Sequence, residues 1–75
     1  MFNKNIFSER VRELRLSKNL KQIELGNILN LSMQTINGIE RGRRTTTFES
    51  LCILSEYFDV SADWLLGLSD TKERR

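Results

Sequence analysis

Residues 22–41 read QIELGNILNLSMQTINGIER, and this stretch decides the fold that the sequence predicts. Two helical patterns, over residues 22–29 and 33–41, are separated by only three residues, Asn30, Leu31 and Ser32. A connection this short forces two helices to cross steeply and leaves one face of the second exposed. Gly26 lies in the middle of the first pattern, where glycine costs about 1 kcal/mol relative to alanine. We therefore expect the second helix to cross at Gly26, where a β-carbon would not fit.

The residues at the ends of this helix pair fit their expected positions. Asn30 tolerates the left-handed conformation that stops a helix sharply. Ser32 is the N-cap candidate of the second helix, and Gly42 is expected as its C-terminal cap. Lys21 cannot accept hydrogen bonds from the free N–H groups of the first helix, so a slightly weakened helix start is expected. Five apolar side chains should pack the pair on a core: Leu25, Leu29, Leu31, Ile36 and Ile39.

A further helix is expected before the pair, over residues 8–18, and two more after it, over residues 48–58 and 62–66. The helix over residues 8–18 has Ser8 as its N-cap candidate. The helix over residues 48–58 has two equally good N-cap candidates, Thr46 and Thr47. Thr46 lies at capping-box spacing from Glu49. Ser61 and Gly67 bound the last helix. Three groups of residues should form the apolar stripes of these helices: Phe7, Val11 and Leu14; Phe48, Leu51, Leu54, Ser55 and Phe58; and Val60, Trp64 and Leu65.

The sequence thus predicts an all-α, compact five-helix domain that spans residues 1–75, with its core over about residues 6–68. The tail, residues 69–75, is polar and charged and is expected to fray. Cys52 is expected to pack beside an apolar stripe. With one cysteine and no histidine, the chain offers neither an internal disulfide nor a metal site. No signal peptide or membrane span is recognisable, so a cytoplasmic protein is expected.

The charges are unevenly distributed along the chain. Residues 1–44 hold nine basic and four acidic residues, a net charge of +5, whereas residues 45–70 hold five acidic residues and no basic one. A basic front of this kind is typical of a nucleic-acid footprint, although ordinary solvated helix faces can produce the same imbalance. The sequence contains no histidine, no paired carboxylates, no nucleophile elbow and no phosphate-binding glycine loop. None of these usual signs of an enzyme is therefore present in it.

The helix pair and its surroundings resemble the helix-turn-helix of the phage repressor and Cro-type regulators, also called the XRE family. The resemblance covers about residues 6–67. The matching positions are Arg15, Gln22, Gly26, Asn30, Ile36, Ile39, the Glu40–Gly42 ending and the VSADWLLG run over residues 60–67. The sequence departs from the family pattern at Asn30, where glycine is usual, at Lys21, where threonine or serine is usual, and at Thr45–Thr47, where proline is usual. The resemblance implies a lambda-repressor-like fold and a bacterial or phage transcription regulator, most simply a repressor.

The resemblance also implies roles for individual residues, because the start of the second helix meets base edges while the first helix crosses the DNA backbone. Four residues are candidates for base contacts: Met33, Gln34, Asn37 and Gly38. Gln34 is the best reader, because its amide can pair bidentately with adenine. Six residues are candidates for phosphate contacts: Lys21, Gln22, Thr35, Arg41, Arg43 and Arg44. Arg43 or Arg44 could alternatively enter an A·T-rich minor groove. The family pattern assigns Arg15 and Glu40 to a structural salt bridge.

The expected partner is double-stranded DNA with a palindromic operator, bound by a homodimer whose recognition helices lie ~34 Å apart. Candidate dimer surfaces are the last helix (Trp64, Leu66, Leu68) and the tail. We expect no cofactor, metal or small-molecule ligand, and association with the bacterial nucleoid when bound. The alternative is a protein-interaction module such as an antitoxin. Its surface would combine an exposed aromatic pair, Tyr57 and Trp64, with the acidic back: Glu49, Glu56, Asp59, Asp63 and Asp70.

Overall fold

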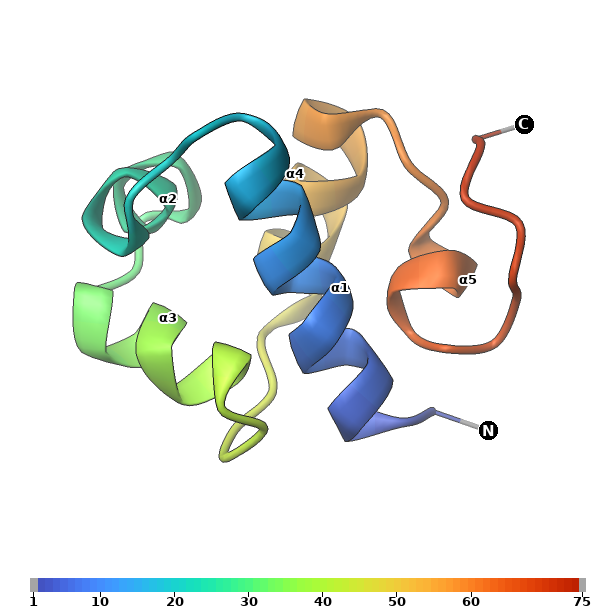
Figure 1. Cartoon of the computed structure of the whole chain (residues 1–75), viewed down its shortest axis with the longest axis horizontal. Coiled ribbons are helices and arrows are strands. Elements are labelled where there is room, and N and C mark those ends of the chain that lie inside the picture. The colour runs from blue at the N-terminus through green and yellow to red at the C-terminus, as the bar shows by residue number, and fades with distance from the viewer. Residues whose placement is uncertain (1, 75) are drawn as a thin grey trace.

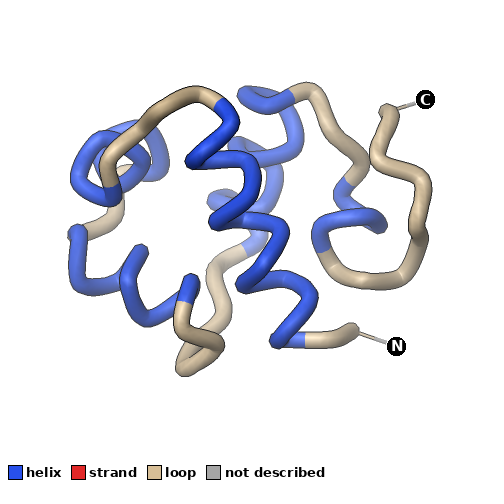
Figure 2. The backbone as a smooth tube through the Cα atoms, viewed as in Figure 1, coloured by secondary structure: helices blue, strands red, loops and turns tan. Residues whose placement is uncertain are grey.

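The structure is a computed structural model, which describes residues 2–74. Within this range the chain forms the helices α1 (Lys4–Ser17), α2 (Gln22–Leu29), α3 (Met33–Glu40), α4 (Phe48–Phe58) and α5 (Ala62–Leu65). The described residues contain no strand, only an isolated antiparallel bridge between Val60 and Glu73. The predicted all-α, five-helix fold is therefore confirmed (Figure 2). No helix in residues 2–74 is long and apolar enough to cross a membrane.

Helix α1 runs through the middle of the molecule and separates two regions (Figure 1). The α2–α3 pair lies on one side of α1, and α5 lies with the carboxyl-terminal tail on the other. Each helix contributes to the core a side chain that is at most 1% exposed: Phe7, Leu25, Ile36, Leu54 and Leu65. The core thus connects both sides and holds the α2–α3 pair against α1 and α4.

Helix α1 begins a turn earlier than the sequence pattern indicated. Asn3 is its N-cap, and Asn3 Oδ1 accepts hydrogen bonds from the N–H groups of Asn5 (3.0 Å) and Ile6 (3.1 Å). The prediction of Ser8 as N-cap is wrong: Ser8 is buried inside the helix, and its hydroxyl donates to the Asn5 carbonyl. Asparagine is itself a favoured cap residue. The helix uses Asn3 and not Ser8, the cap candidate closest to the apolar stripe.

The other helix starts follow the expected cap chemistry. Ser32, Thr47 and Ser61 each accept, through the side-chain oxygen, the N–H of the residue three positions later. The choice between the two threonines is thereby settled in favour of Thr47. Thr46 Oγ1 is buried and has no hydrogen-bond partner within residues 2–74. Three helices end one residue earlier than predicted: α1 at Ser17, α3 at Glu40 and α5 at Leu65.

The first turn of α4 differs from its prediction. Phe48 was expected in the core stripe, but it is 85% exposed. It is the first residue of the helix, and helical side chains tilt toward the amino terminus, so its ring projects past the end of the packed helix. Cys52, one turn further along, was expected to pack and is instead exposed. Leu54 and Phe58, deeper in the same stripe, are buried as predicted.

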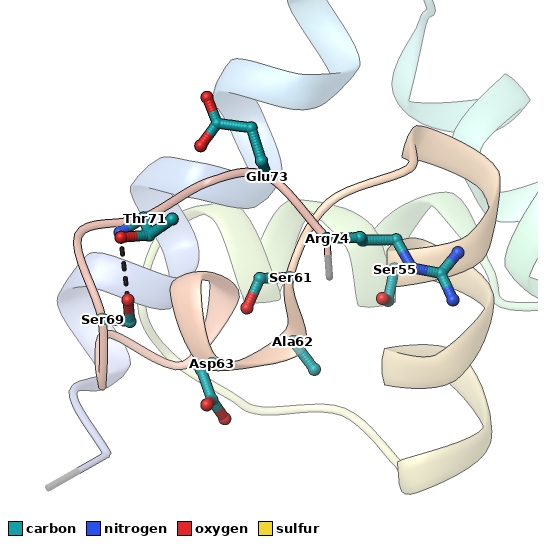
Figure 3. Close-up of a pocket in the computed structure, with 8 residues that line it drawn as sticks. All are labelled: Ser55, Ser61, Ala62, Asp63, Ser69, Thr71, Glu73 and Arg74. Atoms are coloured by element: carbon teal, nitrogen blue, oxygen red, sulfur yellow. Dashed lines mark hydrogen bonds between the residues drawn. The ribbon is translucent and has the colours of Figure 1, made fainter.

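The tail, predicted to fray, folds back on the domain as far as the structure describes it. The Ser61 N–H donates to the Lys72 carbonyl (2.8 Å), and the Arg10 guanidinium donates to the Ser69 carbonyl (3.0 Å). The ammonium of Lys72 lies 3.1 Å from a carboxylate oxygen of Glu13. Figure 3 shows the tail passing α5, with Arg74 extending toward α4. The contacts of Arg10 and Glu13 with the tail join residues 59 positions apart in the chain, which a local pattern does not register.

Candidate nucleic-acid interface

The turn between α2 and α3 is built around a left-handed residue and a glycine. Asn30 has φ 57° and ends α2, and the Leu31 N–H donates to the Gly26 carbonyl (2.8 Å). A β-carbon on Gly26 would lie 2.4 Å from the Leu31 carbonyl oxygen. Gly26 is therefore required by a close approach, as predicted, but the group that approaches is the backbone of the turn and not helix α3.

The start of α2 has a partner that compensates for its unusual cap. The Lys21 side chain makes no capping hydrogen bond, but the Glu24 carboxylate accepts the Lys21 N–H at 2.7 Å. This is one half of a capping box. The negative charge of Glu24 in the first turn also favours the positive end of the helix.

The first turn of α3 presents side chains away from the core. Ile36 and Ile39 are buried on its inner face, whereas Met33 and Gln34 are exposed. Thr35 is half-buried, its N–H donates to Ser32 Oγ (3.1 Å), and the two hydroxyls are 2.9 Å apart. The amino-terminal turn of α3 is thus anchored from within and free on its outer side.

A chain of polar contacts links the first, second and third helices. Glu40 accepts two hydrogen bonds from Arg15, at 2.6 and 3.0 Å, and a longer one from Gln22 Nε2 at 3.3 Å. Gln22 Oε1 in turn accepts from Asn37 Nδ2 at 3.4 Å. The structure therefore brings together four residues to which the sequence assigned three separate roles.

The ion pair at the inner end of this chain is well shielded from water. The Arg15 and Glu40 side chains are 12% and 4% exposed, and Arg15 also donates to the Leu20 carbonyl at 2.7 Å. The hydrogen bond to Glu40 raises the pKa of the Arg15 guanidinium, burial lowers it, and attraction to the Glu40 charge adds to the raise. The result is a raised pKa, so Arg15 is a fixed positive charge that clamps α1 to α3.

The outer end of this chain of hydrogen bonds, at Gln22 and Asn37, opens into a surface hollow. The hollow is lined by Arg12, Arg15, Gln22, Asn37, Glu40 and Arg41. Arg12 is exposed and had not been recognised as a candidate for DNA contact. The available signal was its position three residues before Arg15, which places both on one face of α1.

The basic candidates surround α3 and the loop that follows it. Lys21, Arg41, Arg43 and Arg44 are all exposed. Gly42 follows α3 with φ 72°, the left-handed conformation predicted for its C-terminal cap. Gly38 was expected on the open reading face, but it is half-buried, and a β-carbon there would lie 2.7 Å from Arg44 Cδ. The aliphatic part of Arg44 therefore lies over the carboxyl-terminal half of α3.

The aromatic pair of the protein-interaction alternative is not exposed as a pair. Tyr57 is partly exposed, but Trp64 is only 5% exposed. Arg10 and Lys72 both lie over the Trp64 ring, at 4.8 and 5.1 Å from its centroid. The prediction that Trp64 contributes to an open surface is wrong, because these two cations, one from the folded-back tail, cover it.

Comparison with known proteins places this arrangement among regulators. A family model described as helix-turn-helix matches residues 11–65. The control protein C.SmaI of Serratia marcescens is 36% identical over 72 residues, which cover 96% of this chain and 86% of the relative. The HTH-type transcriptional regulator PrpR of Mycobacterium tuberculosis is 32% identical over 95% of this chain, which spans only 15% of PrpR. The chain also spans less than two thirds of other regulators that it matches, at most 58% of their length.

Solved structures show the same architecture. The P22 c2 repressor, determined in complex with a synthetic operator, has a TM-score of 0.77 and 30% identity, over 85% of this chain and 97% of the repressor chain. The restriction-modification controller protein C.AhdI of Aeromonas hydrophila has a TM-score of 0.71 and 31% identity, over 83% and 94% of the two chains.

Proposed function

The chain belongs to the XRE-type helix-turn-helix family, and from that membership we propose that it is a transcription regulator that binds double-stranded DNA with α3 in the major groove. The observation that carries this proposal is the first turn of α3. It is fixed by the Ser32 cap and by two buried isoleucines, and it offers Met33 and Gln34 to the outside. A rigid helix with free side chains at its amino-terminal end is what base readout in a major groove requires.

Base readout is assigned to the outer face of α3. Gln34 reads adenine through its amide, and Met33 contacts a thymine methyl group. Asn37 reads a neighbouring base from the same face, with its amide held near Gln22. Gly38, half-buried under Arg44, is the weakest of the four candidates for a base contact.

Phosphate contacts are assigned to residues that flank this face. Gln22 is the first residue of α2, where the positive end of the helix attracts an anion. Thr35 adds a hydroxyl near the start of α3. The exposed cations Lys21, Arg41, Arg43 and Arg44 supply the charge that gives most of the affinity.

The regulator acts as a homodimer on a palindromic operator, and repression by occupancy is the simplest mode for a domain of this size. Two copies place their α3 helices ~34 Å apart, one turn of the duplex. The place of action is the bacterial cytoplasm, on the nucleoid.

Site selection from a random duplex pool tests the proposal, followed by binding of the selected duplex by three variants. Gln34→Ala should relax one base position at a cost of ~1–3 kcal/mol. Arg43→Ala should weaken all sequences alike and lower the salt slope by about one. Glu56→Ala, an exposed change on α4, is the matched control and should alter neither. Failure to enrich any sequence from the pool at ~150 mM salt would refute specific binding.

A further inference from the structure

A side chain from the loop after α3 covers a gap in the outer face of this helix. Gly38 lies one helical turn after Gln34 and shares its face, so a side chain at position 38 would also point away from the core. Glycine has no such side chain, yet Gly38 is half-buried. A β-carbon there would lie 2.7 Å from Arg44 Cδ and 3.1 Å from Arg44 Cγ. The aliphatic arm of Arg44 therefore occupies the place that a side chain at position 38 would take.

The end of α3 holds this arm in position. The Gly42 N–H donates to the Ile39 carbonyl (3.0 Å), and the Arg43 N–H donates to the Gly38 carbonyl (2.9 Å). Together with φ 72° at Gly42, these two bonds form a Schellman motif, which turns the chain back over the last turn of the helix. Figure 1 shows the sharp bend of the chain at the end of α3. Arg44 directly follows the motif, so the turn itself directs its arm across Gly38.

The charged end of the arm is free to bind a ligand. Arg44 is exposed, and within residues 2–74 its guanidinium forms no ion pair. Only Nε separates Cδ, which lies against Gly38, from the guanidinium carbon. The N–H donors of this group, five in a planar fork, therefore lie near the outer face of α3.

We propose that Arg44 is a base-reading residue, which reaches a guanine in the major groove across Gly38. The inference rests on the proposed function, because it requires α3 to lie in that groove, and it gives Arg44 a specific contact in addition to its charge. A guanidinium donates two parallel hydrogen bonds to O6 and N7 of guanine, the acceptor pair that distinguishes this base in the major groove. Glycine at position 38 opens this route, since a larger residue would meet the arm.

Two other DNA contacts of Arg44 fit the structure less well. A phosphate contact needs an arm that points to the side of α3, toward the strands that border the groove, whereas this arm crosses the outer face. A minor-groove contact needs an arm that leaves α3, the helix that occupies the major groove. Arg43 is better suited to either role, because none of its atoms lies within 4 Å of the β-carbon position of Gly38.

The geometry of α3 also predicts which base Arg44 reads. Gly38 and Gln34 are one turn apart, about 6 Å along the helix axis. Successive base pairs are about 3.4 Å apart, so the two contacts fall one or two base pairs from each other. We therefore expect a guanine read by Arg44 beside the adenine read by Gln34, within the same half-site. A bidentate contact discriminates against a wrong base by about 5- to 150-fold.

Two variants remove this contact in different ways. Arg44→Met keeps an aliphatic arm and removes the guanidinium. Gly38→Ala keeps the charge and displaces the arm, because the new β-carbon meets Arg44 Cδ. Circular dichroism should show both variants folded, since Arg44 is exposed and alanine favours a helix more than glycine does. Arg43→Met is the matched comparison at the neighbouring arginine. Arg74→Met, on the tail beside Asp59, is the control outside the DNA-binding face.

Selection from a random duplex pool is carried out with the parent chain and with each variant. Arg44→Met and Gly38→Ala should relax the same guanine position, by about 5-fold or more. Gly38→Ala should keep the salt slope of the parent chain, because it removes no charge. Arg43→Met should weaken binding to all sequences alike, and Arg74→Met should select the parental site.

A modified base identifies the groove directly. Replacement of the selected guanine by 7-deazaguanine removes the N7 acceptor, which lies in the major groove. This change should weaken binding by the parent chain at least about 5-fold. It should leave the affinity of Arg44→Met unchanged, because that variant has no donor for N7.

The outcomes separate the inference from the proposed function. If the parent chain selects a site but Arg44→Met relaxes no position, Arg44 contacts a phosphate and the inference is overturned. Relaxation of A·T pairs between the half-sites would place Arg44 in the minor groove and overturn it as well. A guanine that Arg44→Met relaxes but Gly38→Ala still selects would refute the route across Gly38. A parent chain that selects no sequence would refute the proposed function, and the inference with it.

Discussion

Replacement of Glu40 by glutamine should strongly destabilise the domain, because it breaks the shielded ion pair with Arg15. The change keeps the shape of the side chain and removes its charge, which leaves the Arg15 guanidinium without its counter-ion. Both side chains are nearly buried, at 12% and 4% exposure, so solvent screens their attraction little. Breaking a buried pair by removing one partner costs ~3–5 kcal/mol. A 75-residue domain has only about 4–11 kcal/mol in total, so the variant should be close to unfolding.

Urea denaturation followed by the fluorescence of Trp64 measures this loss. For a small domain, with a slope of about 1–1.5 kcal/mol per M of urea, a loss of this size should lower the midpoint by about 2–5 M. Arg15→Met should have a similar effect. Arg15→Met combined with Glu40→Gln removes both charges, so the double variant should be less destabilised than the sum of the two single changes.

The pH dependence follows from the direction of the Arg15 pKa shift. A raised pKa means that the contribution of Arg15 is fully present below its ordinary value and disappears only as pH rises through the raised value. Arg15 should therefore add no pH dependence to stability between about pH 6 and pH 9. A loss below about 1 kcal/mol in Glu40→Gln, or strict additivity in the double variant, would refute the view that this pair clamps α1 to α3.

Three further changes test the turn and the tail. Gly26→Ala should lower stability by ~1–3 kcal/mol, although alanine favours helices, because the new β-carbon meets the Leu31 carbonyl oxygen; an unchanged urea midpoint would show that the turn yields. Asn30→Gly should raise stability by about 1 kcal/mol, because glycine adopts the left-handed conformation without strain; a lower midpoint would contradict this. Removal of residues 69–75 should shift the Trp64 emission to the red and cost ~1–2 kcal/mol, because the hydrogen bonds and the Lys72 cover are lost; an unshifted spectrum would argue against the folded-back tail.

The sequence predicted best where local chemistry determines the structure. The bounds of α2 and α4 follow from helical spacing, and the caps Ser32 and Ser61 follow from the need to satisfy free N–H groups. It failed where the outcome depends on the surroundings. Phe48 has the spacing of a core residue, but it is the first residue of α4 and lies beyond the covered part of the helix, which begins with Ser50 and Leu51. The period of a stripe says which residues share a face and not how far along the helix that face is covered.

The same limit explains why the candidate site could be predicted as residues but not as a unit. The sequence assigned Arg15 and Glu40 to structure, Gln22 to a phosphate and Asn37 to a base. In the structure one hydrogen-bond chain runs through all four. The bonds lengthen outward, from 2.6 Å at the buried pair to 3.3 and 3.4 Å at the two amides, so the inner end is fixed and the outer end is free to exchange partners. DNA can therefore compete for the Gln22 and Asn37 amides without disturbing Arg15. Loss of Glu40 should disturb recognition as well as stability, because it removes the hydrogen bond that ties the Gln22 amide to the clamp between α1 and α3.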